Sequence, residues 1–86
     1  MKKMTNDKYG DALITLRFYL NITKEVHIRI IRGIDSGLFR NGNIIDVNFK
    51  DKTFIIVDRV LGNKKYSVYD IDTDIVPYKE VDNNDR

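Results

Sequence analysis

The segment from residue 44 to residue 71 constrains the fold of this chain most, because two short turn signals within it predict compatible strand pairings. Asp51-Lys52 can close a hairpin between residues 44–50 and 53–61, and Gly62-Asn63 can close a second hairpin with residues 64–71. Two-residue turns fix the pairing of the flanking strands, and a shift of one residue would move every side chain to the other face. The segment therefore predicts a three-stranded antiparallel meander.

The predicted pairing gives the meander two apolar faces. The core face collects large side chains from all three strands: Ile45, Val47, Phe49, Phe54, Ile56, Tyr69 and Ile71. The opposite face carries a second apolar set that we expect to form an interface: Ile55, Val57, Leu61 and Val68. Burying a Val or Ile side chain is worth about 1.5–3 kcal/mol, so we expect this second face to be covered. The cover is residues 12–20 of the same chain, a second copy in a homo-oligomer, or a partner protein.

The residues before the meander predict further strands. Residues 12–20 are rich in β-branched and aromatic side chains, which favours an extra N-terminal strand. The alternative is a helix with one apolar stripe: Ala12, Leu13, Leu16 and Leu20. Residues 26–32 alternate apolar with basic or polar side chains and predict a half-buried strand. Residues 33–43 contain three of the five glycines, so we expect a long loop there.

The chain end predicts a short last strand at residues 75–78, and Pro77 assigns it to a sheet edge because proline has no backbone N–H. With 86 residues, the chain fits a single domain with one modest core. We expect a barrel-like core at residues 26–81, with flexible segments at 1–11 and 82–86. The start is polar and no apolar run is long enough for a transmembrane helix, so we expect a cytoplasmic protein without membrane contact.

The composition argues against metal and redox chemistry. The chain has no cysteine and only one histidine, His27, which excludes a disulfide framework and any thiolate or imidazole-rich metal site. Asp70, Asp72 and Asp74 alternate like the start of a calcium-binding EF-hand loop. The glycine and the glutamate that such a loop requires are replaced by Ile75 and Val81. We therefore expect solvated turn acids, no metal site and no cofactor.

No residue constellation predicts catalysis. Residues 33–37 approach the nucleophile-elbow pattern, but Asp35 occupies the serine position. A catalytic Ser36 would need a base within hydrogen-bond reach, and the single histidine is expected on a strand among basic residues. We therefore expect no catalytic residue and no enzyme activity.

The basic residues are the best candidates for a binding site. We expect six side chains to contact a ligand at the loop rim: Arg29, Arg32, Arg40, Arg59, Lys64 and Tyr66. The predicted pairing places Arg59 opposite Tyr66, an aromatic–guanidinium pair on which a nucleobase could stack. The net charge is only +2, and acidic residues interrupt the basic ones. The candidate ligands are therefore a nucleic acid or a small nucleotide-like phosphate compound.

The predicted order of elements over residues 26–81 resembles the SH3-like barrel: strand, glycine-containing loop, three-stranded meander, short turn and final strand. The ending Asp-Thr-Asp-Ile-Val-Pro-Tyr-Lys-Glu-Val at residues 72–81 is similar to the last turn and strand of small SH3-like proteins encoded by phages and prophages of low-G/C bacteria. This resemblance implies an all-β fold, a small SH3-like barrel or β-sandwich, and an accessory protein that binds and modulates or inhibits a host defence factor. We therefore predict a non-catalytic binding module that self-associates.

Overall fold

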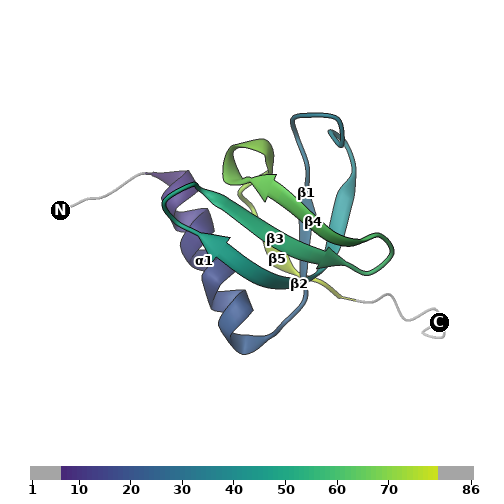
Figure 1. Cartoon of the computed structure of the whole chain (residues 1–86), viewed down its shortest axis with the longest axis horizontal. Coiled ribbons are helices and arrows are strands. Elements are labelled where there is room, and N and C mark those ends of the chain that lie inside the picture. The colour runs from purple at the N-terminus through teal and green to yellow at the C-terminus, as the bar shows by residue number, and fades with distance from the viewer. Residues whose placement is uncertain (1–6, 80–86) are drawn as a thin grey trace.

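The computed structural model describes residues 7–79, which form one helix, five strands and a 3-10 turn (Figure 1). The elements are α1 (Lys8–Ile22), β1 (Val26–Arg29), β2 (Phe39–Asn48), β3 (Thr53–Asp58), β4 (Gly62–Ser67), η1 (Val68–Asp70) and β5 (Val76–Pro77). Residues 8–11, expected to be flexible, form the start of α1. The expectations for residues 1–6 and 80–86 lie outside the described residues.

Residues 12–20 lie within helix α1, so the predicted N-terminal strand is wrong and its helical alternative is confirmed. Asp7 caps the helix, because its Oδ1 accepts hydrogen bonds from the N–H groups of Tyr9 (3.1 Å) and Gly10 (3.2 Å). The helix ends at Ile22, and the residue that caps it, Thr23, has a left-handed φ of 52°. The inner face buries the stripe of the helical alternative: Ala12, Leu13 and Leu16, with Leu20 partly buried.

All five strands pair antiparallel in one sheet of order β4-β3-β2-β1-β5. Strand β2 serves two neighbours, since residues 39–42 pair with β1 and residues 42–48 pair with β3. Gly42 is the position where the two pairings meet. A Cβ at this residue would lie 1.8 Å from the carbonyl oxygen of Val57. Glycine therefore allows β3 to approach β2 closely at this point.

The three-stranded meander is confirmed as β2–β3–β4, but its predicted registers are wrong. The first connection spans four residues, 49–52, so Phe54 pairs with Val47 instead of Phe49. In the second hairpin Asp58 pairs with Gly62 across a turn at residues 59–61. These longer turns displace the two-residue turns that fixed the sequence prediction. As a result Ile45, Phe49 and Tyr69, predicted in the core, are 50%, 42% and 42% exposed.

The second apolar face also does not form as predicted, because it depended on the same registers. Val68 is fully buried, whereas Leu61 lies in the β3–β4 turn and is exposed. Ile55 and Val57 are half-buried on the sheet face that points away from the core. Tyr66 pairs with Phe54 and therefore faces the core side of the sheet. The four predicted interface residues thus lie in three different environments.

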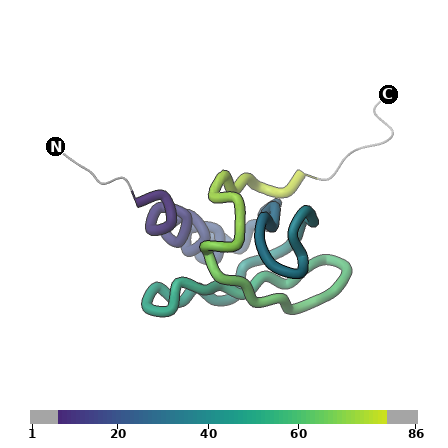
Figure 2. Tube along the Cα trace, turned by 90° about the horizontal axis from the view of Figure 1, so that it is seen from above, coloured from purple at the N-terminus to yellow at the C-terminus, as the bar shows by residue number. Residues whose placement is uncertain are grey.

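The core lies between α1 and one face of the sheet. Figure 2 shows α1 and β5 on one side of the β2–β3–β4 meander. The fully buried large side chains come from the helix, from strands β1 and β3, from the residue that follows β1 and from the segment around η1: Phe54, Leu16, Ile28, Ile30, Ile56, Ile71, Val26 and Val68. The strand predicted at residues 26–32 is confirmed for Val26–Arg29, with Val26, Ile28 and Ile30 buried as the alternation predicts, but it ends earlier, and residues 31 and 32 are exposed in the following loop.

The chain is mostly β, as predicted, with one helix. β4 and β5 are the two edges of the sheet, and the edge position of the Pro77 strand is confirmed. The sheet is not closed into a barrel. Within residues 7–79, no helix is long and apolar enough to cross a membrane.

Candidate functional site: a polar pocket at the rim of the sheet

The β1–β2 loop, residues 30–38, forms one wall of the site. It is shorter than predicted, because β2 begins at Phe39. Its glycines Gly33 and Gly37 both have a φ of +93°, which residues with a side chain rarely adopt. Gly37 N donates to Ile30 O (2.8 Å), and Ser36 Oγ donates to Ile31 O (3.0 Å). The loop therefore has its own internal hydrogen bonds.

Three polar side chains tie this loop to the sheet. Tyr66 Oη donates to Asp35 Oδ2 at 2.7 Å, and Arg40 Nε donates to Tyr66 Oη at 2.8 Å. Arg40 also forms an ion pair with Asp35, with 3.3 Å between Nη2 and Oδ2. Arg40 is buried, so its guanidinium charge needs these partners. We call this triangle of Asp35, Arg40 and Tyr66 the rim cluster.

The rim cluster shifts the ionisation of its members. The hydrogen bond from Tyr66 and the nearby charges of Arg40 and Lys64 hold the pKa of Asp35 below its ordinary value. Burial and the Asp35 carboxylate raise the pKa of Tyr66. The hydrogen bond to Tyr66 and the charge of Asp35 raise the pKa of Arg40 further. At neutral pH the cluster therefore contains a neutral phenol between an ionised acid and a guanidinium.

A pocket of about 310 Å³ opens over the rim cluster. It lies between the β1–β2 loop, strand β4 and the end of η1, and its lining residues are Arg32, Gly33, Ile34, Asp35, Lys64, Lys65, Tyr66 and Asp70. Three of the six predicted ligand contacts, Arg32, Lys64 and Tyr66, thus line one pocket. A fourth, Arg40, forms an ion pair with the lining residue Asp35.

Asp35 and Asp70 are the acidic pocket residues that sequence reasoning missed. Asp35 was considered only as a departure from a serine motif, and Asp70 only as a turn acid. Asp35 and Asp70 line the pocket because the fold brings the β1–β2 loop next to Tyr66 and the end of η1. The predicted register of β4 was wrong, so the sequence did not predict this arrangement. The one available signal was the position of Asp35 between two glycines, because glycines that flank a carboxylate are typical of a tight, structured loop.

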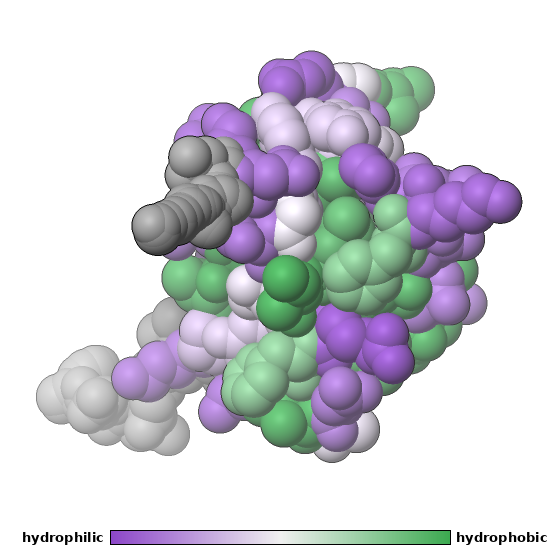
Figure 3. All heavy atoms as spheres, turned by 90° about the vertical axis from the view of Figure 1, so that its left-hand side faces the viewer, coloured by the Kyte–Doolittle hydropathy of each residue, from purple (hydrophilic) through white to green (hydrophobic). Residues whose placement is uncertain are grey.

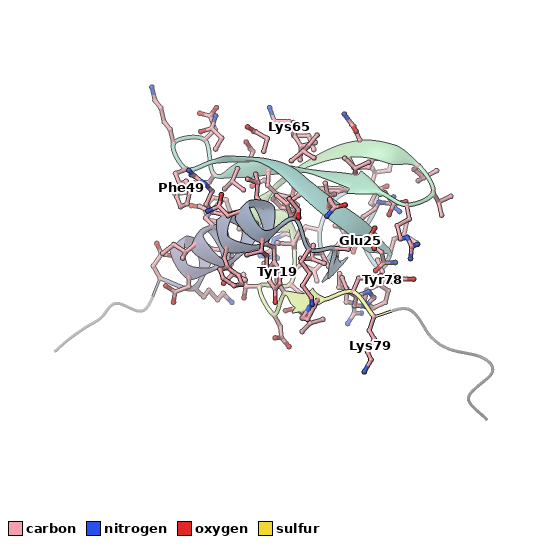
Figure 4. The ribbon with its side chains drawn as sticks, turned by 90° about the horizontal axis from the view of Figure 1, so that it is seen from below. Tyr19, Glu25, Phe49, Lys65, Tyr78 and Lys79 are labelled. Atoms are coloured by element: carbon pink, nitrogen blue, oxygen red, sulfur yellow. The ribbon has the colours of Figure 1, made fainter. Side chains whose placement is uncertain are left out.

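Arg59 and Arg29 lie outside the pocket. Arg59 Nε lies 3.7 Å from Glu25 Oε2, and its Cζ lies 4.9 Å from the centroid of the Tyr78 ring. Figure 4 shows Glu25 and Tyr78 together, away from Lys65, which points away from the sheet. The predicted pairing of Arg59 with Tyr66 is therefore wrong. Arg29 is exposed on β1.

The remaining candidates for chemistry already have structural partners. The ring of His27 stacks on Phe39 at 4.4 Å between centroids and hydrogen-bonds to the Asn41 side chain. Among residues 7–79, no three His, Cys, Asp or Glu side chains gather to hold a metal ion. The rim pocket thus offers cationic donors and one carboxylate, Asp70, beyond the internally paired Asp35.

No family model matches this sequence, and the searches of curated proteins and of solved structures gave no significant match. The SH3-like resemblance and the accessory role that it implies therefore stay predictions.

Proposed function

We propose that this protein is a non-catalytic binding module whose rim pocket takes a small phosphate-bearing ligand. The main support is the meeting of Arg32, from the β1–β2 loop, with Lys64, from strand β4, at one pocket. These two residues lie far apart in the sequence, and both carry donors that bind phosphate oxygens. The pocket volume of about 310 Å³ is at the small end of the ~300–1,000 Å³ range of small-molecule sites.

The charge balance favours an anion. Asp35 is paired with Arg40 and accepts the Tyr66 hydroxyl, so its negative charge is compensated inside the protein. Arg32 and Lys64 then face the pocket with Asp70 as the one further carboxylate. A phosphate group would therefore find a net positive environment.

The ligand is bound through its phosphate and not by stacking on Tyr66. The Tyr66 ring packs beside Phe54, with 6.1 Å between the centroids, and its hydroxyl is engaged in the rim cluster. A long polynucleotide would need several phosphate contacts for useful affinity. The pocket provides a place for one phosphate-bearing group, which favours a compact ligand.

Absence of catalysis is proposed because the candidate groups are engaged elsewhere. Ser36 Oγ donates its hydrogen to a backbone carbonyl, that of Ile31. The ring of His27, on β1, is held by Phe39 and Asn41 of β2. A serine nucleophile requires a histidine or another base at its hydroxyl, and Ser36 has a carbonyl there instead.

The test is a titration of the full chain with inorganic pyrophosphate and with ADP, followed by backbone amide chemical shifts. We expect both probes to cause saturable shifts at residues 32–37, 64–66 and 70, and those of pyrophosphate to be confined to them. Replacing either cation in Arg32→Ala or Lys64→Ala should weaken binding about 10-fold or more, the effect of one charge-assisted hydrogen bond. The matched control is Lys50→Ala, which removes an exposed lysine in the β2–β3 turn and should leave the affinity unchanged.

Two results would contradict the proposal. One is the absence of saturable shifts with both probes at low ionic strength, where electrostatic binding is strongest. The other is equal weakening by Lys50→Ala and Lys64→Ala, which would indicate unspecific attraction of anions. A single-stranded oligonucleotide that binds with a steep salt dependence while pyrophosphate does not would favour the nucleic-acid alternative.

A further inference from the structure

A second pocket, of about 330 Å³, shares Arg32 with the rim pocket. It lies between the start of α1, the first residues of the β1–β2 loop and the chain that follows η1. Figure 2 shows the start of α1 next to the chain around η1, where the rings of Tyr9 and Tyr69 lie 4.6 Å apart between centroids. We call this second cavity the helix pocket. Besides Arg32, its lining residues are Lys8, Tyr9, Ile31, Ile71, Asp72 and Thr73.

Arg32 lies at the junction of the two pockets. The N–H groups of Ile31 and Arg32 donate to Asp70 O at 2.8 and 3.2 Å, which holds the start of the β1–β2 loop against the end of η1. Asp70 lines the rim pocket, and the next residue, Ile71, lines the helix pocket. The Arg32 side chain is exposed and forms no ion pair within residues 7–79. Its guanidinium can therefore bind one ligand that extends into both pockets.

The two pockets differ in charge. The rim pocket is positive overall, whereas the helix pocket, apart from Arg32, is neutral because the charges of Lys8 and Asp72 are opposite. The Lys8 ammonium also lies over the ring of Tyr9, with 5.3 Å between Nζ and the ring centroid. The rim pocket therefore attracts the phosphate, and the helix pocket suits an uncharged part of the same ligand.

The chain after η1 supplies hydrogen-bonding groups to the helix pocket. Asp72 Oδ1 accepts the N–H of Asp74 at 3.0 Å, which orients the carboxylate. Neither Asp72 Oδ2 nor the Thr73 hydroxyl has a hydrogen-bond partner among residues 7–79. A free carboxylate oxygen suits the hydroxyls of a ribose, a contact that dinucleotide-binding folds also use. The same carboxylate repels a phosphate, so it favours the sugar in this pocket.

Aromatic and aliphatic side chains form the rest of the helix pocket. Ile31 is 38% exposed, Tyr9 is half-buried and Ile71 is buried. Polar and apolar side chains meet on the side of the molecule where α1 begins, as Figure 3 shows. Every nucleobase has flat faces that pack on aromatic and apolar side chains. The helix pocket thus combines acceptors for a ribose with a surface for a base.

We propose that the ligand of the rim pocket is a nucleoside phosphate whose nucleoside part occupies the helix pocket. Lys64 and Arg32 bind the phosphate, and Asp72 accepts the ribose hydroxyls. The base packs on Ile31 and Tyr9. This inference rests on the proposed phosphate binding at the rim pocket and adds the chemical class of the ligand, a mononucleotide.

The first test compares ADP with pyrophosphate by the backbone amide shifts of the full chain. Pyrophosphate should shift only the residues of the rim pocket, whereas ADP should add saturable shifts at residues 8, 9 and 71–73. If ADP shifts the rim pocket alone, the inference is overturned and the proposed phosphate binding stands. If neither probe gives saturable shifts, both are overturned.

The second test removes the ribose contact from either partner. Asp72→Ala should raise the Kd for ADP about 10-fold, the effect of one hydrogen bond to a charged group, and should change the Kd for pyrophosphate by no more than about two-fold. The matched control is Asp74→Ala, at an exposed aspartate outside both pockets, which should leave both Kd values unchanged. The analogue 2′,3′-dideoxy-ADP lacks the ribose hydroxyls. It should bind the original protein about 10-fold more weakly than ADP, and Asp72→Ala should not distinguish the two.

Equal binding of ADP and its dideoxy analogue to the original protein would overturn the inference, and this comparison does not depend on the folding of Asp72→Ala. Equal weakening of ADP and pyrophosphate by Asp72→Ala would also overturn it, because the aspartate would then support the rim pocket and not bind the ribose. AMP should bind about 10-fold more tightly than ribose 5-phosphate through the contacts of its base. Equal affinities for these two compounds would show that the base does not enter the helix pocket and would exclude the nucleoside class.

Discussion

The β1–β2 loop and the β3–β4 turn are both held by an aspartate, but the two aspartates use different partners. Asp58 accepts three backbone hydrogen bonds: from Val60 N and Leu61 N at 3.0 Å each, and from Asn41 N at 3.1 Å. Asp35 is held by side chains, the hydroxyl of Tyr66 and the guanidinium of Arg40. Asp58 is buried, whereas Asp35 remains partly exposed at the pocket.

Asp58 is held mainly by local hydrogen bonds, whereas Asp35 is held by long-range contacts. Two of the three donors to Asp58 belong to the turn that directly follows it, so the turn takes its shape largely from neighbouring residues. The partners of Asp35 lie on β2 and β4, and Tyr66 is 31 positions away along the chain. The loop around the pocket is therefore fixed only when the sheet has formed. The rim pocket depends on tertiary structure in a way that the β3–β4 turn does not.

The largest expected effect comes from removing the Asp58 carboxylate. Asp58→Ala leaves three backbone N–H groups without their acceptor, and two of them lie in the turn. We expect the free energy of unfolding to fall by about 3 kcal/mol, the upper end of the range for unsatisfied buried groups. Urea denaturation measures this loss, and amide exchange of Val60 and Leu61 should accelerate beyond the global change.

The control for this change is Asp46→Ala, at an exposed aspartate of β2. It should alter the free energy of unfolding by no more than about 0.5 kcal/mol, as is usual for surface substitutions. If Asp58→Ala were equally mild, the carboxylate would not be what holds the β3–β4 turn, and the contrast with Asp35 would disappear.

The same division between local and long-range causes explains what the sequence could predict. Strand β1 was found from the alternation of Val26, Ile28 and Ile30, and the edge strand from Pro77, because these signals are local. The order of the meander strands also followed from turn-forming residues. Their registers did not, because the connections at residues 49–52 and 59–61 are longer than the dipeptides suggested. A shift in turn length moves every pair in the hairpin.

Helix α1 was predicted as a strand for a related reason. Its apolar residues lie on two opposite faces: the inner face packs on the sheet, whereas Ile14, Phe18 and Ile22 on the outer face are exposed. A segment that is apolar on both sides has no clear 3.6-residue period, so β-branched and aromatic content dominated the prediction. The polar signal that favours a helix was present at Asp7, which caps it.

The candidate site was predicted in part. Arg32, Lys64 and Tyr66 were chosen for their chemistry, and the structure brings them together at one pocket. Arg59 was joined to Tyr66 only through a register, and that register is wrong. Residue type thus identified suitable side chains, whereas their combination required the three-dimensional arrangement of loop and sheet.

Removing the Tyr66 hydroxyl, which holds Asp35, should have a smaller effect than removing the Asp58 carboxylate. Tyr66→Phe deletes the hydroxyl between Asp35 and Arg40 and keeps the ring beside Phe54. We expect a loss of about 1.5 kcal/mol in the free energy of unfolding, the lower end for hydrogen bonds to charged groups, because the cluster is partly exposed. Urea denaturation measures it.

Amide exchange makes this prediction specific to one loop. In Tyr66→Phe the N–H groups of Gly37 and Leu38 should exchange faster, and those of Val60 and Leu61 should change only with global stability. Faster exchange in both loops to the same extent would show that the rim cluster supports the whole sheet end and not the β1–β2 loop alone.

The smallest expected effects are on the pH dependence of stability, and they differ between the two loops. Burial alone would raise the pKa of Asp58, but the hydrogen bonds from Leu61, Asn41 and Val60 outweigh burial and lower it from its ordinary value of 3.8. The pKa of Asp35 is also lowered, mainly by Tyr66. A lowered carboxyl pKa contributes stability that is present above the unfolded value and lost as pH falls below about 4 through the folded value. Acid should therefore destabilise both loops.

Alkaline pH should destabilise only the β1–β2 loop. The pKa of Tyr66 is raised above its ordinary value of 10.0, mainly by burial and then by Asp35. Its contribution is therefore complete below pH 10 and is lost as pH rises through the higher folded value. Tyr66→Phe should reduce the alkaline loss of stability and keep the acid loss from Asp58, whereas Asp58→Asn should reduce the acid loss and keep the alkaline one. Melting temperatures measured across pH for both variants test this, and identical pH profiles for the two would show that the two aspartates do not act separately.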